Sequence, residues 1–184
     1  MENIETLYGH VPASLFDACK SIRLLVLDVD GVLSDGFIYL GNHGEELKAF
    51  NSKDGYGVKA LAQCGVDIAV ITGRSSDIVH KRMQALNAKF IIQGEENKYD
   101  ALKQLMNEHG LSTEQVASIG DDMPDLGLFE LSAIKVAVSD AHPFVKRQAN
   151  HITQLKGGRG AVREFCDLVL QAKGLLNISH GASM

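Results

Sequence analysis

The sequence predicts an α/β fold in which a doubly wound parallel sheet carries helices on both faces. Short apolar, β-branched runs alternate with stretches of helical periodicity along the 184 residues. The runs are apolar almost without interruption, as expected for strands that are covered on both faces. The strand candidates are residues 22–28, 66–72, 89–93, 116–120 and 134–138, with a weaker one at 151–153.

Helical stretches lie between these runs. Asn97 is a candidate N-cap of one helix, and Gly110 is its candidate terminator. Residues 112–115 have the spacing of a capping box but lead directly into a strand, so we give that pattern no weight. The predicted helices are residues 54–64, 75–87, 97–110 and 161–174.

Composition limits the class of protein. The length, with 45% hydrophobic and 22% charged residues, fits one domain over residues 1–184, with a weakly ordered tail at 174–184. A net charge of −5 argues against a nucleic-acid partner, and the apolar runs are too short to span a membrane. Residues 1–10 lack the pattern of a signal peptide. The three scattered cysteines indicate neither disulfides nor a zinc site, so we expect a cytoplasmic protein.

Residues 36–50 interrupt the alternation of strands and helices. Two strand-like halves flank a Gly/Asn/His/Gly turn, which predicts a β-hairpin that projects from the main sheet. Its apolar side chains need cover, either by folding back on their own domain or, as we favour, in a subunit interface. These side chains are Phe37, Ile38, Tyr39, Leu40, Leu47 and Phe50.

Functional residue types gather where the predicted strands end. Ligands bind at the carboxyl ends of the strands in a parallel α/β sheet, so we expect these side chains to face one crevice. They are Asp28 and Asp30 after the first run, Thr72, Gly73 and Arg74 after the second, Lys98 at the start of a helix, and Asp121 and Asp122 after the fourth.

Crowded carboxylates require a positive partner. Asp28, Asp30 and Asp121 would repel one another unless a cation lay between them. A site with few carboxylates, which leaves room for a substrate phosphate, is the pattern expected of Mg²⁺. Residues 28–36 do not form an EF-hand, because they follow a strand and lack its closing glutamate. Asp122 and Asp125 would hold a water on the metal or the Lys98 ammonium.

The same residues suit phosphoryl transfer. Asp28 can attack phosphorus to give an aspartyl phosphate, and Asp30 can protonate the leaving oxygen and then activate water. A hydroxyl from Thr72 and the ammonium of Lys98 would stabilise the phosphoryl oxygens. These elements, in their order along the chain, resemble the haloacid dehalogenase superfamily of phosphatases, which implies a Rossmann-like sheet.

The spacing leaves no room for a cap domain. There are 36 residues between Asp35 and Thr72 and 25 between Thr72 and Lys98, and predicted elements consume both stretches. A site without a cap is open, so either the substrate is macromolecular or a neighbouring subunit closes the site. The apolar hairpin favours a site that a neighbouring subunit closes. We assign Asp35 to the turn into the hairpin and His142 to a structural role.

A second resemblance is more specific. GNHGEELKAFNSKDGYG after DVDGVLSDG, AHP at 141–143 and GGRGAVREFCDL at 157–168 are similar to 3-deoxy-D-manno-octulosonate 8-phosphate phosphatases, over about residues 22–170. The resemblance implies a capless, Mg²⁺-dependent homotetramer that releases the sugar acid Kdo for lipopolysaccharide synthesis. A phosphatase of a related nine-carbon sugar acid and a non-catalytic oligomerisation module are the alternatives.

The same resemblance implies the substrate contacts. Arg159 would reach a neighbour's site and bind the sugar-acid carboxylate, whereas the simpler interpretation of residues 157–160 is a flexible turn. Lys59 and Arg82 could instead be ordinary cations on helix surfaces. The implied substrate-binding residues are Asp30, Asn51, Ser52, Lys53, Asp54, Gly55, Lys59, Gly73, Arg74, Arg82, Lys98 and Arg159.

Overall fold

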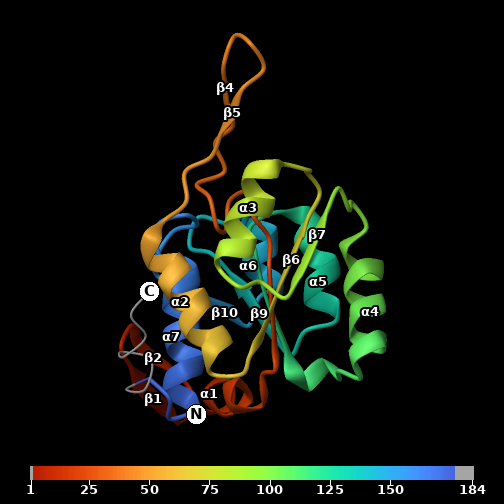
Figure 1. Ribbon diagram of the computed structural model, residues 1–184. Helices are drawn as coiled ribbons and strands as arrows, with labels where there is room; N and C mark the ends of the chain where they lie inside the picture. The colour runs from red at the N-terminus through yellow and green to blue at the C-terminus, as the bar shows by residue number, and fades with distance from the viewer. Residues whose placement is uncertain (1, 177–184) are drawn as a thin grey trace.

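The computed structural model describes residues 2–176 and contains a six-stranded parallel sheet (Figure 1). Its strand order is β10-β9-β8-β3-β6-β7, with β3 in the interior between β8 and β6. Every predicted strand is present, including the weak one. The bounds are β3 Leu24–Leu27, β6 Asp67–Thr72, β7 Phe90–Gln93, β8 Val116–Gly120, β9 Ile134–Ala137 and β10 His151–Ile152.

Helices cover both faces of the sheet, as the apolar character of the strands predicts. In β3, Leu25 and Leu27 belong to a core cluster shared with α1, α2, α3 and α7, whereas Leu24 and Val26 belong to a cluster shared with α4 and α5. Side chains alternate across a strand, so one short strand anchors both layers. The helices are α1 Ala13–Ser21, α2 Ser52–Gln63, α3 Asp77–Ala85, α4 Lys98–His109, α5 Leu126–Glu130, α6 Pro143–Gln148 and α7 Ala161–Ala172.

Local signals fixed several helix ends. The Asn97 side chain caps α4 by accepting from the Asp100 amide, and Gly110 ends the helix in the left-handed conformation, both as predicted. Giving no weight to the capping-box spacing was wrong. Ser112 and Gln115 form that box around the 3₁₀ helix Thr113–Gln115, because a single turn fits before β8 begins.

Two strands and three α-helices were not predicted. A second small sheet, β1 (Asn3–Thr6) with β2 (Gly9–Pro12), and helix α1 precede β3, and the short helices α5 and α6 follow β8 and β9. His142 caps α6 by accepting from the Phe144 amide, which is the structural role expected of it. Among residues 2–176, no helix has the length and apolar character needed to cross a bilayer. From residue 177 onward the predicted tail lies outside the described residues.

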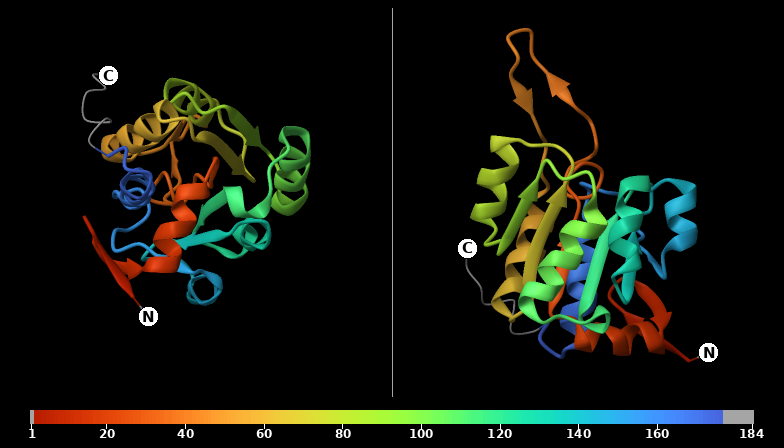
Figure 2. Two further views of the ribbon diagram at one scale, coloured as in Figure 1. Left: turned by 90° about the horizontal axis from the view of Figure 1, so that it is seen from below. Right: turned by 90° about the vertical axis from the view of Figure 1, so that its right-hand side faces the viewer.

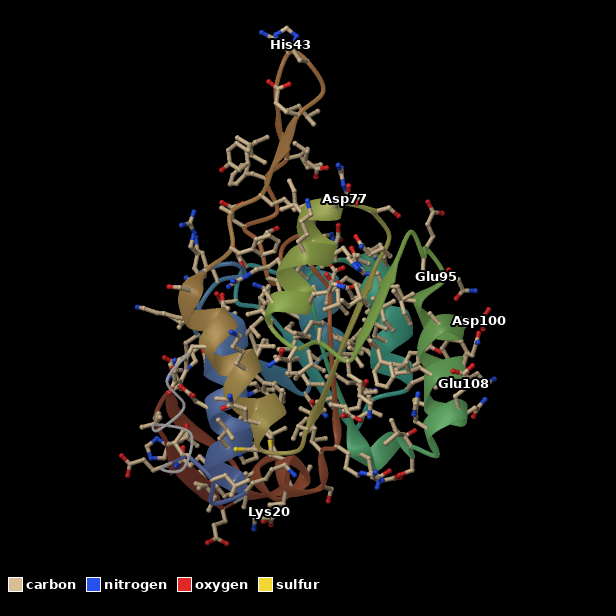
Figure 3. All side chains as sticks on the ribbon, viewed as in Figure 1. Lys20, His43, Asp77, Glu95, Asp100 and Glu108 are labelled. Atoms are coloured by element: carbon tan, nitrogen blue, oxygen red, sulfur yellow. The ribbon has the colours of Figure 1, made fainter. Side chains whose placement is uncertain are left out.

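The hairpin projects from one end of the molecule, opposite the β1-β2 sheet (Figure 2). It pairs β4 (Tyr39–Leu40) with β5 (Glu46–Leu47), and His43 marks its tip (Figure 3). Phe37, Leu40 and Leu47 are 66%, 71% and 66% exposed, and Ile38 and Tyr39 are exposed as well. Of the six apolar residues only Phe50 packs against the core of its own domain. The described residues contain no cap domain over the sheet edge.

Candidate active site

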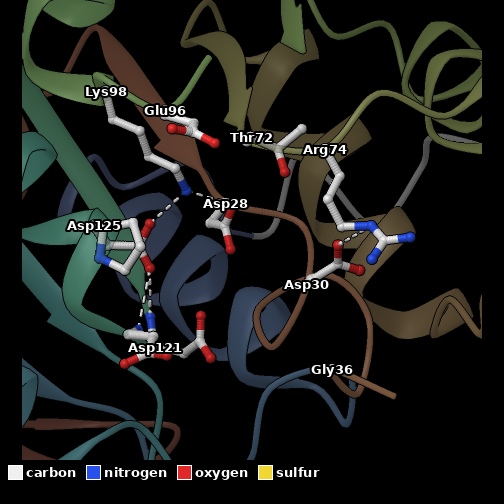
Figure 4. A pocket seen from close by; sticks show the side chains of 12 residues that line it. Asp28, Asp30, Gly36, Thr72, Arg74, Glu96, Lys98, Asp121 and Asp125 are labelled. Carbon is white, nitrogen blue, oxygen red and sulfur yellow. Dashed lines mark hydrogen bonds and ion pairs between the residues drawn. The ribbon is translucent and has the colours of Figure 1, made fainter. Parts of the chain in front are cut away.

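A cavity of about 710 Å³ opens at the carboxyl edge of the sheet, where the sequence predicted a crevice (Figure 4). Polar side chains from the ends of β3, β6 and β8 and from the start of α4 meet there. The lining includes nine predicted residues, namely Asp28, Asp30, Thr72, Gly73, Arg74, Lys98, Asp121, Asp122 and Asp125. It also includes Gly36, Glu96 and Pro124, which were not predicted.

Lys98 joins two carboxylates at the centre of the site. Its Nζ lies 2.7 Å from Asp28 Oδ1 and 2.7 Å from Asp125 Oδ1, and all three side chains are buried (Figure 4). Burial acts to lower the pKa of Lys98, but the Asp125 and Asp28 carboxylates raise it overall. The lysine is therefore held as an ammonium beside Asp28, which is what binding an anion at this point requires.

Asp125 also organises the loop after β8. Its Oδ2 accepts from the Asp121 amide at 2.8 Å and from the Asp122 amide at 3.3 Å. Gly120 makes this possible, because a Cβ there would lie 2.4 Å from Asp125 Cβ. The Asp122 side chain is exposed and accepts from the Met123 amide, so its observed contact is a cap on the following 3₁₀ turn.

Asp28, Asp121 and Asp125 form a cluster of acids. One carboxylate oxygen from each lies within 4.8 Å of the other two. Burial, Asp125 and Asp28 raise the pKa of Asp121 to about 8, and burial and Asp125 raise that of Asp28 to about 6 despite Lys98. A single ammonium does not balance three carboxylates, so the donor set fits a divalent cation with oxygen ligands.

Without a divalent cation, the free energy of unfolding is expected to fall as the pH rises from 7 to 8. The Asp121 carboxyl of the folded protein keeps its proton up to about pH 8, whereas in the unfolded chain it ionises near pH 4. The folded state therefore binds more protons in this range, and raising the pH destabilises it by at most about 1.4 kcal/mol per pH unit. Urea titrations with a chelator would measure this slope.

The matched variant is Asp121→Asn, which should lose most of that slope because it has no carboxyl to titrate. A free energy of unfolding that is flat or rises with pH in the unaltered protein would contradict the expectation.

The Asp30 side chain does not lie where its predicted role as a metal ligand would place it. Its carboxylate is outside the acid cluster and instead binds the Lys48 ammonium, accepts from Ser34 Oγ at 3.3 Å, and lies 3.9 Å from Arg74 Nε. The prediction of Asp30 as a metal ligand finds no support in this carboxylate, because cations already surround it. Arg74 also pairs with Glu46 Oε1 at 3.3 Å.

Residues 157–160 pack under the loop that follows β3. A Cβ on Gly157 would lie 1.6 Å from the Gly31 carbonyl oxygen, and the Gly158 amide donates to the Val32 carbonyl at 2.8 Å. Gly31 itself must lack a Cβ, since one would lie 2.1 Å from Asp121 Oδ2. The segment is a turn, as the simpler interpretation predicted, but these contacts pack it tightly against the loop that carries Asp28 and Asp30.

Arg159 and Asp35 form an ion pair within one chain. Arg159 Nη2 lies 3.3 Å from Asp35 Oδ2, and the arginine side chain is 66% exposed. Asp35 also accepts from the Phe37 amide, which is the predicted turn into the hairpin. Arg159 does not line the cavity of its own chain.

Residues 51–55 do not line the cavity. The prediction that Asp54 binds substrate was wrong. Its buried carboxylate accepts from the Gly160 amide at 3.2 Å and the Arg163 amide at 2.8 Å, so it holds the N-terminus of α7. Asp54 cannot contact substrate from there. Gly55 is also buried, under Arg82, whose Nη2 would lie 2.4 Å from a Cβ.

The remaining predicted contacts lie outside the cavity. Asn51 caps α2 by accepting from the Lys53 amide, and Ser52 and Lys53 are exposed on its first turn. The Arg82 guanidinium stacks 5.9 Å from the centre of the Phe50 ring, while its Nε is buried without a hydrogen-bond partner. The residues that the cavity of this chain does not include are Asn51, Ser52, Lys53, Asp54, Gly55, Lys59, Arg82 and Arg159.

Besides the lining residues Gly36, Glu96 and Pro124, sequence reasoning missed two charged residues beside the site. Lys48 and Glu46 come from the hairpin and contact Asp30 and Arg74. The only available signal was the three charged residues in the second half of the hairpin, Glu45, Glu46 and Lys48. The sequence does not reveal that the side chains of Glu46 and Lys48 turn back towards the sheet.

The fold and the cavity define a class of protein. A family model described as haloacid dehalogenase-like hydrolase matches residues 87–165, which include Lys98, Asp121 and Asp125. With a parallel sheet, carboxylates at its carboxyl edge and no cap among residues 2–176, the described part of the chain has the architecture of a haloacid dehalogenase-like hydrolase.

Individual relatives narrow this class. The 3-deoxy-D-manno-octulosonate 8-phosphate phosphatase KdsC of Escherichia coli K12 is 46% identical over 182 residues, which cover 99% of this chain and 97% of KdsC. The crystal structure of that phosphatase from Yersinia pestis matches with a TM-score of 0.93 and 45% identity, over 96% of this chain and 95% of its own.

A third match is a complex from Moraxella catarrhalis. That phosphatase was solved with magnesium ion, phosphate ion and KDO, and it matches with a TM-score of 0.87 and 39% identity over 90% of this chain and 95% of its own. The chain therefore belongs to the family of 3-deoxy-D-manno-octulosonate 8-phosphate phosphatases.

Proposed function

We propose that this protein hydrolyses 3-deoxy-D-manno-octulosonate 8-phosphate to Kdo and phosphate in lipopolysaccharide synthesis, with Mg²⁺ as its metal. One observation carries the chemistry. The Asp28 carboxylate lies 2.7 Å from a buried lysine ammonium, and Asp121 and Thr72 line the same cavity. The relatives that act on this substrate support its identity.

In the proposed mechanism Asp28 is the nucleophile. Its carboxylate attacks phosphorus to form an aspartyl phosphate while the sugar oxygen leaves. Lys98 and Thr72 donate hydrogen bonds to the phosphoryl oxygens and hold them in line with the attack. Asp125 keeps Lys98 in place through their 2.7 Å contact.

Asp30 is the proposed general acid and base. It gives a proton to the leaving oxygen and then takes one from the water that hydrolyses the aspartyl phosphate. Arg74 and the Gly73 backbone, at the wall of the same cavity, would orient the substrate. An arginine suits this task because its planar fork binds phosphate or carboxylate oxygens in pairs.

Mg²⁺ would be held by Asp28 and Asp121, whose carboxylates belong to the acid cluster. The expected ligand set also contained Asp30, which we omit because its carboxylate binds Lys48. When bound, the cation would neutralise charge that develops on the phosphoryl oxygens. Asp122, exposed at the rim, could hold a water on the cation.

The experiment is an assay of phosphate release from Kdo 8-phosphate, from related nine-carbon sugar acid phosphates and from simple hexose phosphates. We expect the highest kcat/KM for Kdo 8-phosphate. Efficient turnover of another sugar phosphate with none of this one would refute the proposed substrate.

We also propose that the protein is a cytoplasmic homotetramer whose projecting hairpins pack between subunits. The exposed apolar side chains of the hairpin support this assembly, as do three free cysteines for a reducing compartment. Ser52, Lys53, Lys59, Arg82 and Arg159 would then contribute to substrate binding only through a neighbouring subunit. Light scattering that found a stable, active monomer would argue against the tetramer.

A further inference from the structure

We infer that Lys48, at the base of the projecting hairpin, is a positioning residue for the acid–base carboxylate of Asp30. The inference rests on the proposed function, because it uses the role proposed there for Asp30. It assigns the hairpin a part in the active site of its own chain, in addition to any contact with other subunits.

The environment of Lys48 is unusual for a residue of an exposed hairpin. The lysine directly follows β5, yet its side chain is only 1% exposed. Its ammonium binds Asp30 Oδ1 and lies 3.3 Å from Glu46 Oε1. Burying an ammonium is costly unless acceptors surround it, so this placement ties the hairpin to the loop after β3.

The contacts of Asp30 divide between its two oxygens. Oδ1 receives both the Lys48 ammonium and the Ser34 hydroxyl, whereas Oδ2 is the oxygen that faces Arg74 at 3.9 Å (Figure 4). The contacts of Lys48 and Ser34 with Oδ1 set the orientation of the carboxylate. Oδ2 is then the oxygen positioned to give a proton to the leaving group and to take one from water.

Two further contacts hold the hairpin in this place. Glu46, from β5, bridges Lys48 and Arg74, with 3.3 Å to each. The backbone of Ser34 also pairs with that of Phe50 across the base of the hairpin. The network contains two cations and two anions, so it is neutral, and two of its four members come from the hairpin.

The test compares leaving groups. In Kdo 8-phosphate the sugar oxygen needs a proton as it leaves, whereas p-nitrophenolate is stable as an anion and needs little help. Lys48→Met should lower kcat for the sugar phosphate about 10- to 100-fold, since general acid catalysis contributes about 10²–10⁴-fold. Its KM for that substrate and its kcat for p-nitrophenyl phosphate should change little.

Two variants serve as controls. Lys48→Arg keeps a cation at Asp30 Oδ1 and should restore most of the lost kcat. Lys20→Met removes an exposed ammonium that pairs with Asp17 and should leave both activities unchanged. Equal losses of kcat for both phosphates in Lys48→Met, or no loss for either, would overturn the inference.

A crystal structure of Lys48→Met provides a readout that does not depend on activity. We expect the Asp30 carboxylate to rotate away from its present orientation, and an unchanged carboxylate would overturn the inference. Failure of the proposed function would look different, because the unaltered protein would then release no phosphate from Kdo 8-phosphate.

Discussion

Asp28→Asn is expected to lower kcat by about 10⁴-fold or more, as removal of a nucleophile does in other covalent enzymes. The amide oxygen is a poor nucleophile, so no aspartyl phosphate forms. The change is nearly isosteric and leaves an acceptor for Lys98, whose Nζ now lies 2.7 Å from Asp28 Oδ1. Steady-state phosphate release from Kdo 8-phosphate measures the effect, and circular dichroism checks the fold.

Asp17→Asn is the matched control, because Asp17 is an exposed acid of α1 that pairs with the exposed Lys20. It should retain full activity. Substantial turnover by Asp28→Asn of verified mass would remove Asp28 from the role of nucleophile.

Removal of divalent cations is expected to abolish turnover, and Mg²⁺ should restore it. Three clustered carboxylates face one lysine ammonium, so an anionic substrate cannot approach without a further cation. Binding to the folded state also adds stability, by about 2.7 kcal/mol when Mg²⁺ is about 100 times its dissociation constant. The melting temperature should therefore rise by about 5–10 °C on addition of Mg²⁺.

Asp121→Asn should need a higher Mg²⁺ concentration for half-maximal activity, whereas Asp77→Asn, an exposed acid on α3, should not (Figure 3). Full activity in a chelator, or equal Mg²⁺ requirements for both variants, would contradict the proposed metal site.

The residues that sequence reasoning brought together are those that follow strands. A parallel sheet places every strand end at one edge, so the neighbourhood of Asp28, Thr72 and Asp121 follows from strand order alone. Lys98 was predictable for the same reason, since it opens the helix after β7. Direct contacts such as that between Lys98 and Asp125 depend on the directions of the side chains, which the sequence around these residues only suggests.

Residues on helices and in the hairpin were harder to place. Asp54 lies on the first turn of α2, and its neighbours in sequence do not reveal that it faces α7 instead of the cavity. Lys48 was missed because a hairpin that leaves the domain is expected to expose its polar residues. The strands β1 and β2 have four residues each and few apolar positions, so no period-2 pattern marks them.

The packing of Gly157 against Gly31 has a consequence for how activity arises during synthesis. The loop that carries the candidate nucleophile emerges early from the ribosome, but the segment that braces it comes near the end of the chain. Closing such a distant contact is a late and slow step in folding. A nascent chain that has not yet exposed residues 157–158 would therefore hold all its proposed catalytic residues and still be unable to hydrolyse phosphate esters.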